Sequence, residues 1–249
     1  MIFALAFLFG LVVGSFLNVV IHRVPLRESI VWPSSHCPEC GVAISPRDNL
    51  PLLSYALLRG RCRSCRVHIS FRYPLIEALT AGLFGLAAYV FGPSVELLSA
   101  LVLIGVLVVL AATDLEHRLL PNAIIGPAAL IGFGISVAVE PSRWWVYLAS
   151  ALMVGGALLA LALAYPGGMG MGDVKMGGML GMFLGPYAAL AVFLGALLGA
   201  AIGGALILLG KTNRHTALPF GVFLALGGLA ALFVGPEIWV AYLRLAGVV

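Results

Sequence analysis

The chain has 249 residues, of which 62% are hydrophobic and only 10% are charged, and its formal net charge is +4. Soluble domains carry about 25% charged residues, and disordered segments are polar and rich in charge. The composition therefore excludes a soluble globular domain and a disordered chain, and it predicts a protein that lies mostly in lipid. The small positive charge then indicates membrane topology, and no nucleic-acid partner is expected.

The first membrane span is predicted at residues 1–22, because a span needs about 20 mostly apolar residues. No basic segment precedes it, so it does not resemble a cleaved secretory signal. Arg23 and Arg27 follow it directly. By the positive-inside rule, the N-terminus is expected outside and the next segment in the cytoplasm.

Residues 23–73 form a polar loop that carries eight of the 14 Lys and Arg residues and all four cysteines. Cys37 and Cys40 form one C-x-x-C pair, and Cys62 and Cys65 form a second. This spacing is typical of a structural zinc site with four sulfur ligands, which is closed and does not catalyse. Two disulfides are the alternative, but a reducing cytoplasm disfavours them. A redox C-x-x-C would need a βαβ context, which the sequence lacks.

The rest of the chain, residues 74–249, returns to apolar runs broken by glycine, proline and charge. We expect an all-α polytopic membrane protein with about eight spans and a small cytoplasmic zinc-binding loop domain after the first. A short tail at 237–249 is expected to lie in the membrane interface. The further helices are predicted at 75–92, 96–113, 122–139, 144–165, 176–185 (short for a span), 187–209 and 217–234.

The basic residues support this layout, with twelve predicted inside and two outside. No internal repeat suggests a transporter built from two halves. Beyond the loop, the inside residues are Arg118, Lys175, Lys211 and Arg214, and the outside residues are Arg143 and Arg244.

Two aspartates are predicted at the cytoplasmic membrane boundary. Asp114 ends an apolar run, and Asp173 stands in a glycine-rich segment with Gly170 and Gly172. Two spans separate them, and an even number of crossings returns the chain to the same side. Two close carboxylates share one proton, so one can take a proton from water while the other donates to a carbonyl oxygen. Glycines let a substrate backbone approach closely.

Other interpretations of the aspartates remain open at this point. Asp173 could cap its helix, and Asp114 could be a solvated helix-end residue paired with Arg118. Two intramembrane carboxylates could also relay protons in a proton-coupled transporter. A zinc-bearing scaffold without chemistry is a further alternative.

Taken together, five segments in order resemble the type IV prepilin leader peptidase family, whose members are GxGD membrane aspartyl proteases. Pro219-Phe220-Gly221 also recurs, with Val222 where the family often has proline, a departure expected to affect helix shape more than chemistry. The five segments are Gly14 to Pro25, the cysteine loop with Leu53-Ser54-Tyr55 and Arg59-Gly60-Arg61, Arg72-Tyr73-Pro74-Leu75-x-Glu77, Asp114 with Leu120-Pro121-Asn122, and Gly170-x-Gly172-Asp173-x-Lys175.

The resemblance implies an aspartyl endopeptidase of the bacterial inner membrane with Asp114 and Asp173 as its catalytic dyad. Such enzymes cut the leader from type IV prepilins, and from the pseudopilins of type II secretion, after a glycine at the cytoplasmic face. Members with the zinc loop also methylate the new N-terminus, with S-adenosylmethionine as the methyl donor.

Four further residues have open roles. Lys175 either biases Asp173 toward its charged form, binds an acidic group of the substrate, or extends to the headgroups. For the methyl-transfer site the sequence offers only the weak candidates Arg23, Arg72 and Glu77, because no nucleotide-binding fingerprint is present. A structural Arg–Glu pair is the alternative for Glu77.

Overall fold

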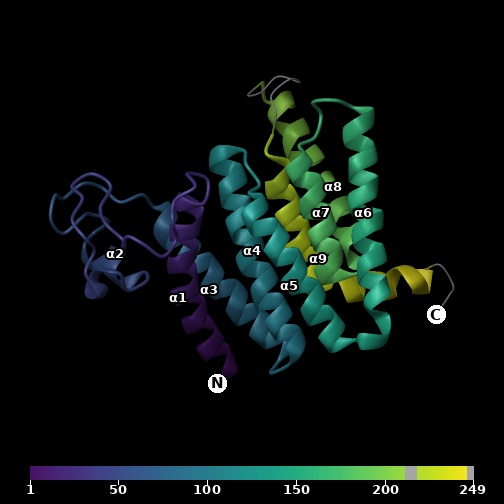
Figure 1. Ribbon diagram of the computed structural model, residues 1–249, viewed down its shortest axis with the longest axis horizontal. Helices are drawn as coiled ribbons and strands as arrows, with labels where there is room; N and C mark the ends of the chain where they lie inside the picture. Colours follow the sequence, from purple (N-terminus) through teal and green to yellow (C-terminus); the bar gives the residue numbers. More distant parts are fainter. Residues whose placement is uncertain (211–217, 246–249) are drawn as a thin grey trace. The chain divides into compact units, whose positions relative to one another are not determined.

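The computed structural model describes residues 1–210 and 218–245, and this part of the chain is helical (Figure 1). Its only β-structure is two isolated bridges in the cysteine loop. The chain divides into two compact units, residues 1–97 and 98–249. The all-α prediction is therefore confirmed.

The first unit contains α1 (Ile2–Arg23), η1 (Pro46–Asp48), α2 (Leu53–Leu57) and α3 (Arg72–Phe91). Helices α1 and α3 pack closely because small residues on α1 face the α3 backbone. A Cβ on Gly10 would lie 2.7 Å from the Cα of Ala81, and one on Gly14 would lie 2.8 Å from the Cα of Glu77. This is the G-x-x-x-G spacing that lets membrane helices approach.

The second unit is a bundle arranged around one short helix, α7. Helices α5, α6, α8 and α9 all contact α7, whose side chains Met176, Met179 and Leu180 are buried in the apolar core. The helices are α4 (Val95–His117, which begins in the first unit), α5 (Asn122–Val139), α6 (Trp144–Ala164) after η2 (Pro141–Arg143), α7 (Met171–Leu184), α8 (Tyr187–Leu208) and α9 (Phe220–Leu245).

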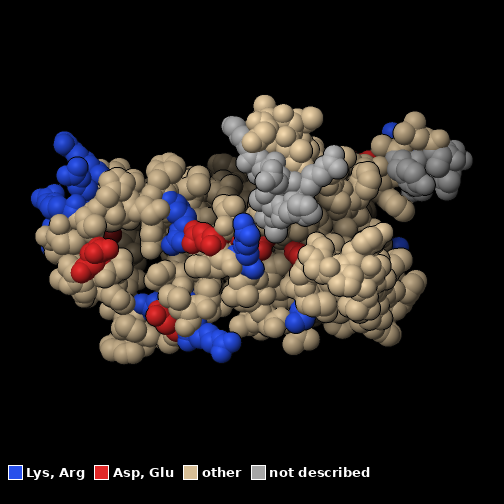
Figure 2. Space-filling view, turned by 90° about the horizontal axis from the view of Figure 1, so that it is seen from above, with Lys and Arg blue, Asp and Glu red and all other residues tan. Residues whose placement is uncertain are grey.

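Seven helices are long and apolar enough to span a membrane in the described part of the chain, and α7 is not among them. Its 14 residues extend about 21 Å, shorter than a hydrocarbon core of about 30 Å. The helix predicted at 176–185 therefore exists, but it begins five residues earlier, at Met171. In Figure 2, which looks onto the helix ends, uncharged side chains still cover most of the visible surface.

Helix α9 differs most from its prediction. It continues through Gly235 and Pro236 to Leu245, and its last part turns aside from the bundle in Figure 1. A proline inside a helix removes one backbone hydrogen bond, and this permits a bend without ending the helix. Lys211 and Arg214, predicted on the inside, lie outside the described residues.

Candidate functional site

The four cysteines of the loop converge on one point. Their sulfur atoms all lie within 4.8 Å of one another, and the Sγ atoms of Cys37 and Cys65 are 3.8 Å apart. A tetrahedral zinc site with bonds of about 2.3 Å has sulfur–sulfur edges of about 3.8 Å. None of the four cysteines forms a disulfide. The cluster could therefore bind a metal ion, and its geometry fits zinc.

The two C-x-x-C pairs are folded as two copies of one turn, 25 residues apart. The N–H of Cys37 donates to the Val42 carbonyl at 3.0 Å, and the N–H of Cys62 donates to the Val67 carbonyl at 2.9 Å. The residue after the second cysteine of each pair has a positive φ: Gly41 at 69° and Arg66 at 60°. Each turn is closed by a bridge, His36 with Ala43 and Arg61 with His68.

Backbone hydrogen bonds, desolvation and neighbouring thiols give the Cys62 and Cys65 thiols different acidities. Backbone N–H groups of Cys65 and Ser64 lower the pKa of Cys62 to about 7, which favours the thiolate that metals bind. The Val67 N–H lowers the pKa of Cys65, but desolvation and the neighbouring thiols outweigh it and raise that pKa to about 12. The two thiols therefore differ in acidity although they belong to one cluster.

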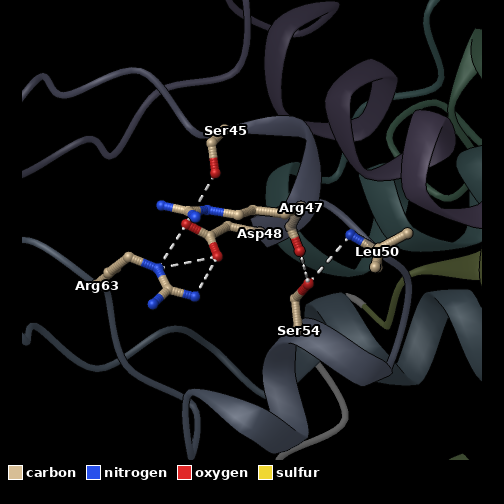
Figure 3. Close-up of polar contacts among 6 residues, drawn as sticks. All are labelled: Ser45, Arg47, Asp48, Leu50, Ser54 and Arg63. Atoms are coloured by element: carbon tan, nitrogen blue, oxygen red, sulfur yellow. Dashed lines mark hydrogen bonds and ion pairs between the residues drawn. The ribbon is translucent and has the colours of Figure 1, made fainter.

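An ion pair between Arg63 and Asp48 links the two turns (Figure 3). Arg63, within the second C-x-x-C, donates from Nε and Nη2 to both carboxylate oxygens of Asp48, at 2.6 to 3.0 Å. Asp48 follows the first turn and also accepts from the Ser45 hydroxyl at 3.0 Å. The Arg63 guanidinium holds the pKa of Asp48 below its ordinary value.

The three weak candidates for methyl transfer flank the loop, Arg23 at the end of α1 and Arg72 and Glu77 in α3. Arg23 is buried and donates to the Ser29 carbonyl at 2.9 Å. Glu77 is also buried; it accepts from the Leu52 N–H at 2.8 Å and hydrogen-bonds to Ser15, so its described contacts are with the loop backbone and α1. Arg72 lies over the ring of Tyr73 at the start of α3.

In the second unit, Asp114 is held at the start of another helix. It is buried in the last turn of α4. Its Oδ2 accepts from the Val222 N–H at 3.2 Å, and the Gly221 N–H also donates to it. Gly221 and Val222 lie in the first turn of α9, where backbone N–H groups have no partner within the helix. The carboxylate therefore caps α9 and lies at the positive end of its dipole.

The hydrogen bond from Val222 to Asp114 bears on one expectation from the sequence. We expected its replacement of the family's frequent proline to affect helix shape more than chemistry. The structure adds a contact that this expectation did not include, because the Val222 N–H donates to Asp114 and a proline has no N–H to donate.

Like Asp114, Asp173 lies at the N-terminus of a helix, which here is its own helix, α7. It is buried in the first turn, and its Oδ2 accepts from the Gly170 N–H at 3.2 Å. It thus bonds the N-cap residue Gly170 from the third position of its own helix, where the alternative interpretation had it as the N-cap itself, and it also lies within electrostatic range of Asp114. The two buried carboxylates therefore stand near each other at the N-termini of two helices.

The segment after α4 holds these parts in place. Leu120 lies between two glycines, since a Cβ on Gly172 would be 2.8 Å from its Cβ and one on Gly221 would be 3.0 Å from its Cδ2. The neighbouring Asn122 accepts from Lys175 Nζ at 2.9 Å. Leu120 and Asn122 therefore link the motif around Asp114 to the motif around Asp173.

Sequence reasoning missed some of these partners. The N–H donors of Gly221 and Val222 could not be identified, because no local pattern shows which distant helix start a carboxylate caps. The sequence did offer a clue to the Asn122–Lys175 contact, because both residues belong to the motifs that carry the resemblance.

Two family models match the chain. The Bacterial Peptidase A24 N-terminal domain matches residues 8–91, which include the cysteine cluster. The Type IV leader peptidase family matches residues 101–209, which include both aspartates. No solved structure matches the chain.

Several curated proteins named prepilin leader peptidase/N-methyltransferase are similar to the chain. The one from Bacillus subtilis is 36% identical over 245 residues, covering 98% of each chain. The one from Stutzerimonas stutzeri is 33% identical over 270 residues, covering 97% of this chain and 93% of the relative. The one from Myxococcus xanthus is 44% identical over 219 residues, covering 84% and 65% respectively.

The matches cover the cysteine loop, both aspartates and nearly the whole chain, as the motifs predicted. This multi-pass membrane protein belongs to the bacterial peptidase A24 family, that of the prepilin leader peptidases/N-methyltransferases.

Proposed function

We propose that this enzyme cleaves the leader from type IV prepilins or pseudopilins at the cytoplasmic face of the bacterial inner membrane, with Asp114 and Asp173 as its catalytic dyad. The observation that supports the proposal is that these two buried carboxylates lie within electrostatic range of each other, each at the N-terminus of a helix. The names of the relatives supply the substrate class.

The dyad performs acid–base catalysis without a covalent intermediate. Two close carboxylates in a buried site cannot both ionise, so they share one proton. The ionised member removes a proton from water, which attacks the scissile carbonyl carbon. The protonated member donates its proton to the carbonyl oxygen, and the tetrahedral intermediate then collapses as the leaving amine is protonated. Gly172 lets Leu120 pack against the start of α7 beside Asp173, and the substrate's apolar helix stays in the bilayer.

Lys175 acts on the substrate side of this site rather than on Asp173. It is exposed, and its described hydrogen bond is to Asn122, which fixes the ammonium next to the Leu120 segment. From there it can attract an acidic group of the substrate.

We further propose that the enzyme methylates the new N-terminus and that zinc stabilises its loop. Cys37, Cys40, Cys62 and Cys65 would hold the ion in a closed four-sulfur site, so its role is structural. S-adenosylmethionine supplies the methyl group when it is bound. Binding of metal contributes folding free energy to small loops that bury little apolar surface.

Leader release from a purified prepilin by the purified enzyme in detergent tests the proposal. We expect Asp114→Asn and Asp173→Asn each to reduce cleavage to background, with helix content and metal content unchanged. Glu140→Gln is the matched control, because Glu140 is an exposed carboxylate whose described partner is Arg143, and it should cleave normally. Normal cleavage in either aspartate variant would remove that residue from the dyad. Solute flux into vesicles with no cleavage would favour a transporter instead.

A further inference from the structure

A cavity of about 420 Å³ lies in the first unit between α1 and the cysteine loop. Its wall is apolar and comes from Val12, Phe16 and Val19, which share one face of α1. Its roof comes from the loop and places the polar residues Ser34, Ser35 and Asn49 among apolar ones such as Val31 and Leu50. A volume of this size suits a ligand no larger than a nucleoside derivative.

Arg23, the last residue of α1, also lines the cavity. It is only 6% exposed. Its guanidinium has five N–H donors, and its one described hydrogen bond is to the neutral carbonyl of Ser29. No carboxylate in the described part of the chain lies within ion-pair distance of it. A buried charge is normally paired. The Arg23 guanidinium therefore suits the cavity to a ligand that carries an anionic group.

Glu77, on α3, contacts both the wall and the roof of this cavity. Its carboxylate hydrogen-bonds to Ser15, which lines the wall. It also accepts the N–H of Leu52 at 2.8 Å, the residue that follows Leu50 and Pro51 in the roof. Glu77 is therefore a positioning residue, whose two contacts set the separation between α1 and the loop.

We propose that this cavity is the methyl-transfer site, where Arg23 binds the carboxylate of the methyl donor beside the polar residues of the roof. The proposal rests on the proposed N-methyltransferase function. Val12 and Phe16 are 62% and 49% exposed on a membrane span, so the apolar wall continues onto a surface that faces lipid. A polar cosubstrate and the N-terminus of a membrane-embedded peptide can therefore reach the cavity from different sides.

The chemistry needs only proximity and a neutral amine. The lone pair of the N-terminal nitrogen attacks the methyl carbon of the donor, and the carbon–sulfur bond breaks with its electron pair passing to sulfur. The resulting secondary ammonium loses a proton to water. Holding the two reactants together supplies most of the acceleration for such a transfer.

Binding of S-adenosylhomocysteine, the demethylated product, to the purified zinc-loaded enzyme tests this site by calorimetry. We expect Arg23→Gln to weaken binding at least about tenfold, because a hydrogen bond to a charged group is lost, while leader cleavage stays at the wild-type rate. Arg23→Lys should recover part of the affinity. Arg27→Gln is the matched control, because Arg27 is exposed and does not line the cavity. Equal affinity in Arg23→Gln and wild type overturns the proposal.

A second variant tests the cavity independently in case Arg23→Gln misfolds. Ser35→Phe fills the cavity from the roof without removing a charge, and it should abolish binding while metal content and cleavage are unchanged. Glu77→Gln, which can still accept from Leu52, should bind nearly as well as wild type, whereas Glu77→Leu should not. Phospholipid that copurifies with wild type and is lost in Arg23→Gln, with S-adenosylhomocysteine binding unchanged, would assign the cavity to lipid and overturn the proposal.

The outcomes separate this inference from the function on which it rests. A wild-type enzyme that neither binds S-adenosylhomocysteine nor methylates a cleaved pilin contradicts the methyltransferase function itself. A wild-type enzyme that does both, with Arg23→Gln and Ser35→Phe equally competent, contradicts only the site.

Discussion

Leu120 and Gly172 are in such close contact that a Cβ on Gly172 would lie 2.8 Å from the Cβ of Leu120. The backbone of α7 and the segment after α4 therefore approach as closely as they do only because residue 172 has no side chain. Asp173 is the next residue, so this contact determines how near α7 brings it to Asp114.

Gly172→Ala is accordingly expected to reduce leader cleavage at least about tenfold, since displacements of about 1 Å can cost a hundredfold in rate. Gly178→Ala, in the same helix, is the matched control. Its Cβ would meet the Ala151 carbonyl oxygen at 3.7 Å, an ordinary contact, so its cleavage rate should stay within about twofold of wild type. Initial rates on a prepilin measure both, and equal rates would contradict the close-contact argument.

Val222→Pro removes the N–H that donates to Asp114 without breaking α9, because proline is tolerated in the first turn of a helix. The ionised form of Asp114 loses a donor that stabilises it, so the acidic limb of the pH–rate profile should move to higher pH. Val222→Ala keeps the N–H and should leave the profile in place. A profile that moves equally in both variants would mean that the side chain, not the hydrogen bond, is responsible.

Arg66 and Gly41 occupy equivalent positions in the two cysteine turns, and both have positive φ. A side chain in this conformation costs about 1 kcal/mol. Arg66→Gly should therefore stabilise the metal-loaded loop by up to about 1 kcal/mol, and Gly41→Ala should destabilise it by a similar amount. Nothing lies within 4 Å of a Cβ on Gly41, so crowding does not contribute. Metal release to a chelator measures the change, and a slower release from Gly41→Ala would refute it.

Removal of the metal should separate the two proposed activities. Cys65→Ser leaves three sulfur ligands and should lower the zinc content of the purified enzyme well below one ion per chain. Methylation of a cleaved pilin should fall because the roof of the cavity belongs to the same loop, whereas leader cleavage should continue. Methylation at the wild-type rate in a zinc-free enzyme would contradict a structural role for the ion.

Much of this architecture is readable from the sequence because its signals are local or depend on counting. Hydrophobic runs predict the helices, and the C-x-x-C spacing predicts the cluster. The number of spans between Asp114 and Asp173 predicts that they share one side of the membrane. The duplicated turn also had a signal, since Cys37-Pro38-Glu39-Cys40-Gly41-Val42-Ala43-Ile44-Ser45 and Cys62-Arg63-Ser64-Cys65-Arg66-Val67-His68-Ile69-Ser70 share C-x-x-C-x-V-x-I-S.

What could not be predicted depends on contacts between distant segments. The pairing of Asp114 with the start of α9 joins residues 108 positions apart. The early start of α7 at Met171 was missed because glycines weaken helix propensity, whereas here Asp173 caps the first turn and neighbouring helices bury the rest. The continuation of α9 through Pro236 was missed for a similar reason: proline predicts an end, and the structure has a bend.

The most direct test of the central claim is a comparison of cleavage rates for Asp114→Asn, Asp173→Asn and the double variant. If the two carboxylates act as one unit, all three rates should be equally low, because removal of either member abolishes the shared function. If either single variant keeps a rate well above that of the double variant, the residues act independently, and the paired mechanism is wrong.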